Sequence, residues 1–90
     1  MSEIRFSFGR IVITPGAASV LKRPAQTREL LARHISGDWG DVPPEDAAEN
    51  ERSVKEGCRI LSAYKVNRTR LWVLTEADRS VTTILLPSEY

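Results

Sequence analysis

Residues that carry metal or redox chemistry are scarce in this 90-residue sequence, which has one cysteine and one histidine. A single cysteine cannot form an internal disulfide, and this usage favours a reducing, cytoplasmic compartment. His34 and Cys58 stand 24 positions apart, a separation that matches no zinc-ligand spacing. The acidic residues also lack the order of a calcium loop. We therefore expect no metal and no cofactor.

Long apolar runs and glycine-rich loops are missing as well. The longest clearly apolar stretches are three or four residues, for example 71–74 and 84–86. A membrane-spanning helix needs about 20 apolar residues, so no membrane association is expected. The first residues lack the basic-then-apolar order of a signal peptide. No phosphate-loop or dinucleotide fingerprint is present, which argues against a nucleotide-binding enzyme.

Net charge is low, but its distribution along the chain is uneven. The formal charge is +1, which excludes a polycationic nucleic-acid arm. Residues 1–37 sum to +4, residues 38–56 to −5 and residues 57–90 to +2. The acidic segment has three interpretations: a solvated helix face, a surface that docks on a basic partner as a nucleic-acid mimic, or a side that repels nucleic acid. Ten of the thirteen basic residues are arginines, which favour phosphate and carboxylate contacts.

The length predicts a single domain over residues 1–90, of the α+β class. Ile4, Phe6 and Phe8 alternate with polar residues, a pattern that predicts a half-buried strand within residues 4–14. Gly9 is expected to bend this strand, to form a bulge or to divide it in two. The sequence thus begins with one strand or two.

Three short helices are expected next. Thr14 and Pro15 form a helix start, and that helix ends before Pro24. A second helix is expected from near Thr27 to Gly37, which is a suitable left-handed stop. A third covers residues 44–56, with acidic residues in its first turn.

The last third predicts a three-stranded antiparallel meander over residues 58–66, 70–76 and 80–86. A short turn at 67–68 sets Tyr64 opposite Leu71 and Ala63 opposite Trp72. Both faces of the middle strand are apolar, so we expect it to be central, with helices on at least one side of the sheet.

Each residue that could serve in catalysis could also have a purely structural role. His34 shares the apolar face of its helix, so it is either a packed histidine bonded to a loop carbonyl or to Asp38, or a general base paired with Asp38. Cys58 opens a predicted strand and is expected to be a buried small residue rather than a nucleophile. No serine lies in a nucleophile-elbow context. The sequence therefore predicts that the protein is not an enzyme.

Two further strings are candidates for binding. Two glycines flank Trp39, which makes the tryptophan either a core plug or an exposed interface anchor. Asp78 and Arg79 occupy the second turn of the meander, where Arg79 can pair with Glu76. The predicted binding residues are His34, Asp38, Trp39, Glu45, Asp46, Glu49, Arg68, Arg70 and Arg79.

Two strings carry a resemblance to a known family: residues 34–40, His-Ile-Ser-Gly-Asp-Trp-Gly, and residues 72–80, Trp-Val-Leu-Thr-Glu-Ala-Asp-Arg-Ser, continuing to Tyr90. With these strings the chain resembles a family of small proteins from bacterial plasmids, integrated elements and phages, described only as plasmid-related. The resemblance spans nearly the whole chain. It implies a mobile-element setting, and it brings no activity, cofactor or catalytic residue.

The element order also resembles that of RelE/ParE ribonuclease toxins, whose strongly basic composition this chain does not share. Candidates for such chemistry are Tyr64, Arg68, Arg70, Arg79 and Tyr90. The leading hypothesis is a non-enzymatic binding or regulatory protein of a mobile element that acts by protein–protein contact, with nucleic acid a less favoured partner. The alternatives are a RelE/ParE-like ribonuclease toxin and a counter-defence inhibitor of a host nuclease.

Overall fold

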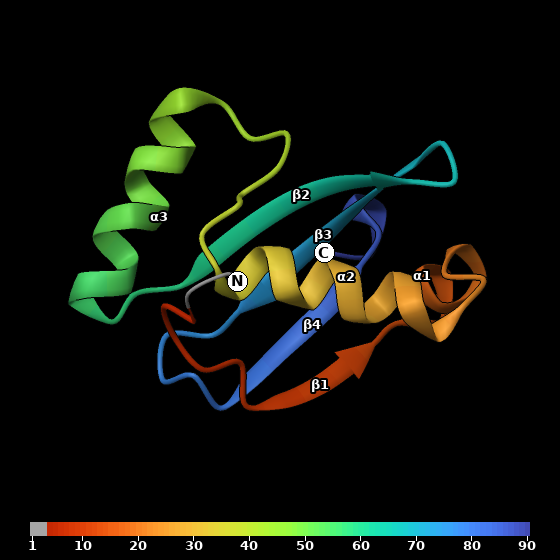
Figure 1. The fold of residues 1–90 in the computed structure, drawn as a ribbon, viewed down its shortest axis with the longest axis horizontal. Helices are drawn as coiled ribbons and strands as arrows, with labels where there is room; N and C mark the ends of the chain where they lie inside the picture. Colours follow the sequence, from red (N-terminus) through yellow and green to blue (C-terminus); the bar gives the residue numbers. More distant parts are fainter. Residues whose placement is uncertain (1–3) are drawn as a thin grey trace.

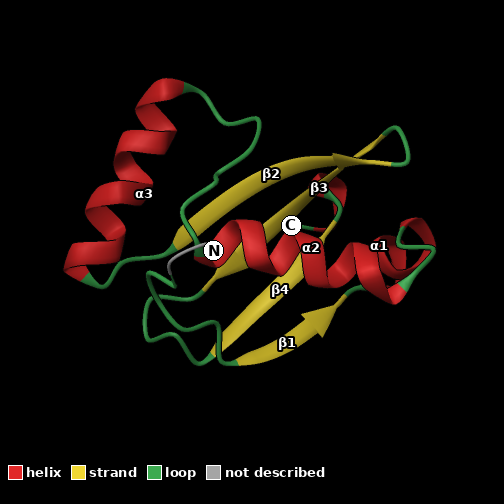
Figure 2. Cartoon of the chain, viewed as in Figure 1, coloured by secondary structure: helices red, strands yellow, loops and turns green. Residues whose placement is uncertain are grey.

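A computed structural model describes residues 4–90. It contains a four-stranded sheet with helices packed against it, which confirms the predicted α+β class (Figures 1 and 2). The sheet order is β1-β4-β3-β2. The strands are β1 (Arg10–Ile13), β2 (Ile60–Val66), β3 (Thr69–Thr75) and β4 (Val81–Leu85). The helices are α1 (Pro15–Val20), α2 (Pro24–Ile35), α3 (Pro44–Glu56) and the short 3-10 helix η1 (Pro87–Glu89).

The C-terminal meander has the predicted register. β2 and β3 are antiparallel, with Tyr64 opposite Leu71 and Ala63 opposite Trp72. The two turn residues between them, Asn67 and Arg68, have φ angles of 49° and 68°. Two successive left-handed residues match the twist of the flanking strands, which explains the tight two-residue connection. β3 is an interior strand, as predicted.

The first strand differs from the prediction. Residues 4–9 form no strand, and β1 begins only at Arg10, where it runs parallel to β4. The cause lies at Gly9, whose φ is +61° and where a Cβ would collide with the Ser80 carbonyl. The chain bends there, and the Phe6 ring packs edge-on against His34 at 5.1 Å between ring centroids. The alternating pattern therefore reflects aromatic packing rather than strand pairing.

The second helix also differs, because α2 begins at Pro24, three residues before the predicted start at Thr27. Proline suits the first helical position, where its missing N–H costs no hydrogen bond. α1 begins at Pro15 behind the Thr14 cap, and α3 ends at Gly57 with φ 73°, both as expected. No helix in residues 4–90 combines the length and apolarity needed to cross a membrane.

The helices α1 and α2 cover one face of the sheet, and α3 lies beyond the β2 edge (Figure 1). The core between the helices and the sheet consists of Ala17, Leu30, Tyr64, Leu71, Val73 and Ile84. On the opposite face, Tyr90 packs edge-on against Trp72, with ring centroids 5.6 Å apart. The sheet thus has two edges that differ in their surroundings, β1 on one side and β2 on the other.

Candidate functional site

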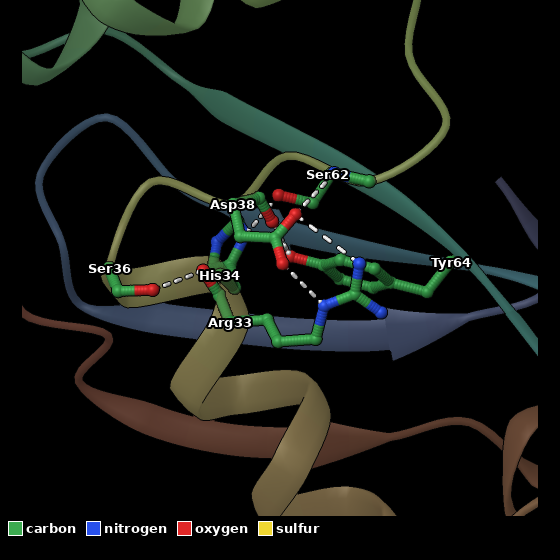
Figure 3. A network of polar contacts seen from close by, with 7 residues as sticks. Arg33, His34, Ser36, Asp38, Ser62 and Tyr64 are labelled. Atoms are coloured by element: carbon green, nitrogen blue, oxygen red, sulfur yellow. Dashed lines mark hydrogen bonds and ion pairs between the residues drawn. The ribbon is translucent and has the colours of Figure 1, made fainter. Parts of the chain in front are cut away.

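His34 is completely buried at the C-terminal end of α2 (Figure 3). Its Nδ1 lies 2.6 Å from the Ser62 hydroxyl, and its Nε2 lies 2.8 Å from the Thr75 hydroxyl. The interpretation as a packed histidine is therefore confirmed. The expected partners were wrong, because hydroxyls from two strands take the place of a loop carbonyl or Asp38.

The proton of His34 can be placed by following this chain of hydroxyls. Thr82 donates to the carbonyl oxygen of Phe8, so it must accept from Thr75, 2.6 Å away. Thr75 has then used its only proton and must accept from Nε2–H of His34. Nδ1 is consequently the acceptor for Ser62. The imidazole has no access to solvent. This burial, with a smaller contribution from the Arg79 charge, lowers the pKa of His34 to about 3, so the imidazole is neutral at physiological pH.

Asp38 pairs with Arg33 rather than with His34. The Arg33 Nε donates to the Asp38 carboxylate at 2.7 Å, and this bond lowers the pKa of Asp38 (Figure 3). The same carboxylate accepts from the Gly40 amide at 3.2 Å, while the Tyr64 hydroxyl donates to the Asp38 carbonyl at 2.6 Å. The His34–Asp38 catalytic pair considered from the sequence is thus wrong. Asp38 holds the loop between α2 and α3 in place.

Trp39 is a core plug, since only 6% of the residue is exposed. Its ring stacks on Phe6 at 6.2 Å between centroids, and its Nε1 donates to the Glu51 carboxylate at 3.0 Å. The two terminal guanidinium nitrogens of Arg5, Nη1 and Nη2, donate to the Glu51 carboxylate at 2.9 and 2.6 Å. The alternative of Trp39 as an exposed interface anchor is wrong. The Arg5–Glu51 pair was missed, because residues 46 positions apart share no local signal.

Arg79 is bonded to the backbone instead of standing free for a partner. Its Nη1 lies 2.7 Å from the Cys58 carbonyl, and its Nη2 lies 2.9 Å from the Ser53 carbonyl near the end of α3. The expected Arg79–Glu76 side-chain pair is absent, since the Glu76 carboxylate pairs with Arg59 at 3.2 Å. The role of Arg79 as a binding residue is therefore corrected to that of a structural link.

Cys58 also differs from the prediction. It lies before β2 and is exposed, whereas a buried position in a strand was expected. The reason is that β2 starts only at Ile60, after the left-handed Gly57 has ended α3.

The remaining predicted binding residues lie in two separate places. Glu45, Asp46 and Glu49 are exposed on α3, and Glu49 pairs with Arg52 at 2.9 Å. Arg68 and Arg70 lie at the β2–β3 turn, at the other end of β2 from α3 (Figure 1). The acidic and basic candidates therefore do not form one surface.

The edge of β2 is covered at Leu61 and Ala63 by two sets of contacts. The Asn50 side chain of α3 donates to the Leu61 carbonyl at 2.7 Å and accepts from the Leu61 amide at 3.2 Å. Further along, the Ala63 amide donates to the Trp39 carbonyl at 3.1 Å, and the Asp41 amide donates to the Ala63 carbonyl at 2.7 Å. The outward-facing backbone groups of Leu61 and Ala63 are thus satisfied. Such blocking is a common protection against unwanted strand pairing.

The edge of β1 is open. The amides of Arg10 and Thr14 donate to the carbonyls of Ser80 and Ile84, at 3.0 Å each, so alternation directs the N–H and C=O groups of Ile11 and Ile13 away from the sheet. No other strand of residues 4–90 pairs with this edge. Val12 and Ile13 remain 37% and 38% exposed. Sequence reasoning missed this edge, because the apolar run at 11–13 indicates a strand but not its position at the end of the sheet.

A groove of about 490 Å³ lies beside Ile13, between β1, α1 and α2; we refer to it as the β1 groove. Its lining is mainly apolar, with Ala18 and Leu21 beside Ile13. Three exposed cations, Lys22, Arg23 and Arg28, border it, and they form no salt bridge within residues 4–90. The β1 groove and the open strand edge together form the candidate site.

Within residues 4–90 no group of three or more histidine, cysteine or acidic side chains is arranged to hold a metal ion. The arrangement at β1 combines outward-facing backbone groups, an apolar groove and positive charge, features that occur in sites of strand addition. Comparisons with protein-family models, with curated proteins and with solved structures found no match to this chain.

Proposed function

We propose that this protein is a non-enzymatic binding module that takes up an extended segment of a partner protein along the open edge of β1. The observation that carries the proposal is the contrast between the two sheet edges. At the β2 edge the outward groups of Leu61 and Ala63 bond to Asn50 and to the segment around Gly40, whereas no strand of residues 4–90 pairs with the outward groups of Ile11 and Ile13.

Strand addition is an established mode of peptide recognition, in which main-chain hydrogen bonds supply affinity and side-chain pockets supply specificity. β1 offers both parts. Its free backbone groups lie next to the β1 groove, and the exposed Val12 and Ile13 provide apolar surface on the two faces of the strand. An exposed apolar edge of this kind is a liability for a protein that has no use for it.

An enzymatic function has less support, because three of the groups considered for chemistry, His34, Tyr64 and Arg79, are engaged internally. His34 is enclosed by hydroxyls, and Tyr64, whose pKa is raised to about 12 by burial, donates to the Asp38 carbonyl. Arg79 is bonded to backbone carbonyls. A ribonuclease toxin would need such groups free and close together, so that alternative rests on element order alone.

The mobile-element setting is part of the same proposal and rests on the resemblance of residues 34–40 and 72–90. A regulatory protein and a counter-defence inhibitor of a host nuclease both act through protein contact. Either role is compatible with strand addition at β1. The acidic helix α3 would then be a solvated face that keeps nucleic acid away from one side.

The test compares Ile11→Pro with Ile11→Ala. Proline removes the outward N–H of residue 11, and edge strands tolerate proline where the N–H faces outward. Alanine removes similar packing and keeps the N–H. The full chain, carrying a photo-crosslinker at Ser7, is expressed in a bacterial host, and cross-linked proteins are identified by mass spectrometry.

We expect Ile11→Ala to keep the wild-type partner and Ile11→Pro to lose it, with far-UV circular dichroism showing both variants folded. A partner captured equally by the proline variant would overturn the proposed site. Turnover of any substrate by the purified wild-type chain would overturn the non-enzymatic role.

A further inference from the structure

We infer that the partner segment combines an apolar anchor with flanking acidic residues, the anchor entering the β1 groove and the acids meeting its cationic border. This inference rests on the proposed function and adds the chemistry of the ligand. It is carried by the lining of the groove and by its position relative to the open strand.

The register of β1 shows where an anchor would go. Ile11 and Ile13 are aligned with Thr82 and Ile84, which face the helix-covered core. The side chains of a strand added beyond β1 alternate between the two faces in the same way. Every second side chain therefore lies on the groove side, next to Ile13. An apolar side chain there would bury surface against Ala18 and Leu21.

The charges around the groove determine which residues are favoured on either side of the apolar anchor. Lys22, Arg23 and Arg28 border it, and no acidic side chain from the described part of the chain lines it. The Lys22 ammonium donates to the Ser19 carbonyl at 2.8 Å, which leaves its charge uncompensated. Acidic residues on either side of the anchor would be attracted to this border, and basic ones would be repelled.

A second copy of the chain fits this surface less well. Antiparallel pairing of two β1 strands would bring Arg10 of one copy toward Ile13 and the cationic border of the other, because Arg10 and Ile13 are the two ends of the strand. Like charges in that arrangement oppose association. The acidic helix α3 has the complementary charge, but a helix cannot supply the backbone groups that extend a sheet. We therefore commit to a different protein with an extended acidic segment.

The experiment uses three labelled peptides with blocked ends. The first has a valine–isoleucine–valine centre flanked on each side by two glutamates, so that either strand direction brings acids to the border. The second replaces the glutamates by lysines, and the third replaces the apolar centre by three serines. Binding to the full-length protein is measured by fluorescence anisotropy and mapped by two-dimensional ¹⁵N–¹H spectra.

We expect the glutamate peptide to bind about tenfold more tightly than the lysine peptide, and more weakly as salt is raised. The serine peptide should bind weakly, because it lacks the anchor. Amide shifts should be confined to β1 and the groove. Arg28→Glu should weaken the glutamate peptide about tenfold, whereas the matched control Lys55→Glu, on the exposed part of α3, should leave it unchanged.

Equal affinity for the glutamate and lysine peptides, equal effects of the two charge reversals, or shifts centred away from β1 would each overturn the inference. So would a concentration-dependent dimer that Ile11→Pro abolishes. If Ile11→Pro removes a cellular partner but no acidic peptide binds, the ligand chemistry is wrong while the edge remains the binding site. If Ile11→Pro captures the cellular partner as well as wild type does, the proposed function itself is wrong.

Discussion

The buried imidazole of His34 couples the stability of the protein to pH. The folded state holds the pKa near 3, whereas an unfolded chain has the ordinary value of 6.5. Between these values the unfolded state binds a proton that the folded state does not bind. The free energy of unfolding therefore falls as the pH is lowered through this window, by about 1.4 kcal/mol per pH unit.

We expect wild-type protein to lose about 2 kcal/mol of stability between pH 7 and pH 5, as measured by urea denaturation. His34→Gln, which has no titratable group, should be less stable at pH 7 but should show little change over that range. The lowered carboxyl pKa values, as at Asp38 and Glu51, affect stability only at lower pH. A slope that persists in His34→Gln would show that another group is responsible.

Arg79 is the second residue whose role can be tested alone. Its guanidinium reaches carbonyls at Ser53, Cys58, Glu76 and Ala77, and so ties the end of α3 to the β3–β4 turn. Arg79→Ala should cost about 2–3 kcal/mol in the free energy of unfolding, because charged donors are lost from several acceptors at once. Arg79→Lys should recover less than half, since one ammonium cannot span both groups of carbonyls.

Chemical denaturation of the two variants measures these costs. A cost below about 0.5 kcal/mol for Arg79→Ala, the size expected of an ordinary surface change, would contradict the structural role.

At the residue scale the sequence left alternatives open. The apolar helix face and the flanking glycines indicated a packed position for His34 and Trp39 beside a binding role, and the structure confirms the packed position, whereas the burial expected at Cys58 was wrong. The partners of His34 and Trp39 were not predictable, because the two hydroxyls bonded to His34 come from β2 and β3 and Glu51 comes from a distant helix. Within residues 4–90 every buried side-chain nitrogen and oxygen has a hydrogen-bond partner. These partners come together only in the assembled fold.

Among the elements, the bridge between residues 39–41 and β2 depends on Gly40. Its φ is +74°, and an added Cβ would collide with the Ala63 carbonyl and approach the Tyr64 ring. Gly57 has nearly the same φ, +73°, but an added Cβ there meets nothing within 4 Å. Alanine at Gly57 therefore measures the free-energy cost of the left-handed backbone alone, and alanine at Gly40 measures that cost plus the cost of the collision.

We expect Gly57→Ala to destabilise the protein by about 1 kcal/mol and Gly40→Ala by about 3 kcal/mol or more, in thermal or urea unfolding. Gly40→Ala should also speed amide exchange at Ala63, whose N–H donates to the Trp39 carbonyl. Equal costs for the two substitutions would mean that the bridge contributes nothing to stability.

Element boundaries were predicted where capping residues or turns define them, as for α1, α3 and the β2–β3 register. They were missed where tertiary contacts decide. Residues 4–8 alternate like a strand, yet Phe6 packs against His34 and Trp39, because the chain turns away from the sheet at Gly9. η1 was not predicted; it brings Glu89 to the start of α1, where the Gly16 amide donates to its carboxylate at 3.0 Å.

At the scale of the whole molecule, the difference between the two sheet edges follows from chain topology. β1 pairs in parallel with β4 and so becomes a terminal strand, a placement that no local pattern in residues 10–13 reveals. The segment that closes the β2 edge comes from the α2–α3 loop and from α3. The candidate site was therefore not predictable from the sequence, although its apolar and cationic residues were all visible there.

The most direct test of recognition at β1 is amide hydrogen exchange of the full chain, resolved by residue, with and without the glutamate-flanked peptide. In the free protein we expect Ile11 and Ile13 to exchange rapidly, and Leu61 and Ala63, whose amides are bonded, to exchange slowly. Saturating peptide should slow Ile11 and Ile13 and leave Leu61 and Ala63 unchanged. Slow exchange of Ile11 and Ile13 in the free protein, or no added protection at saturation, would contradict an open edge that receives a partner strand.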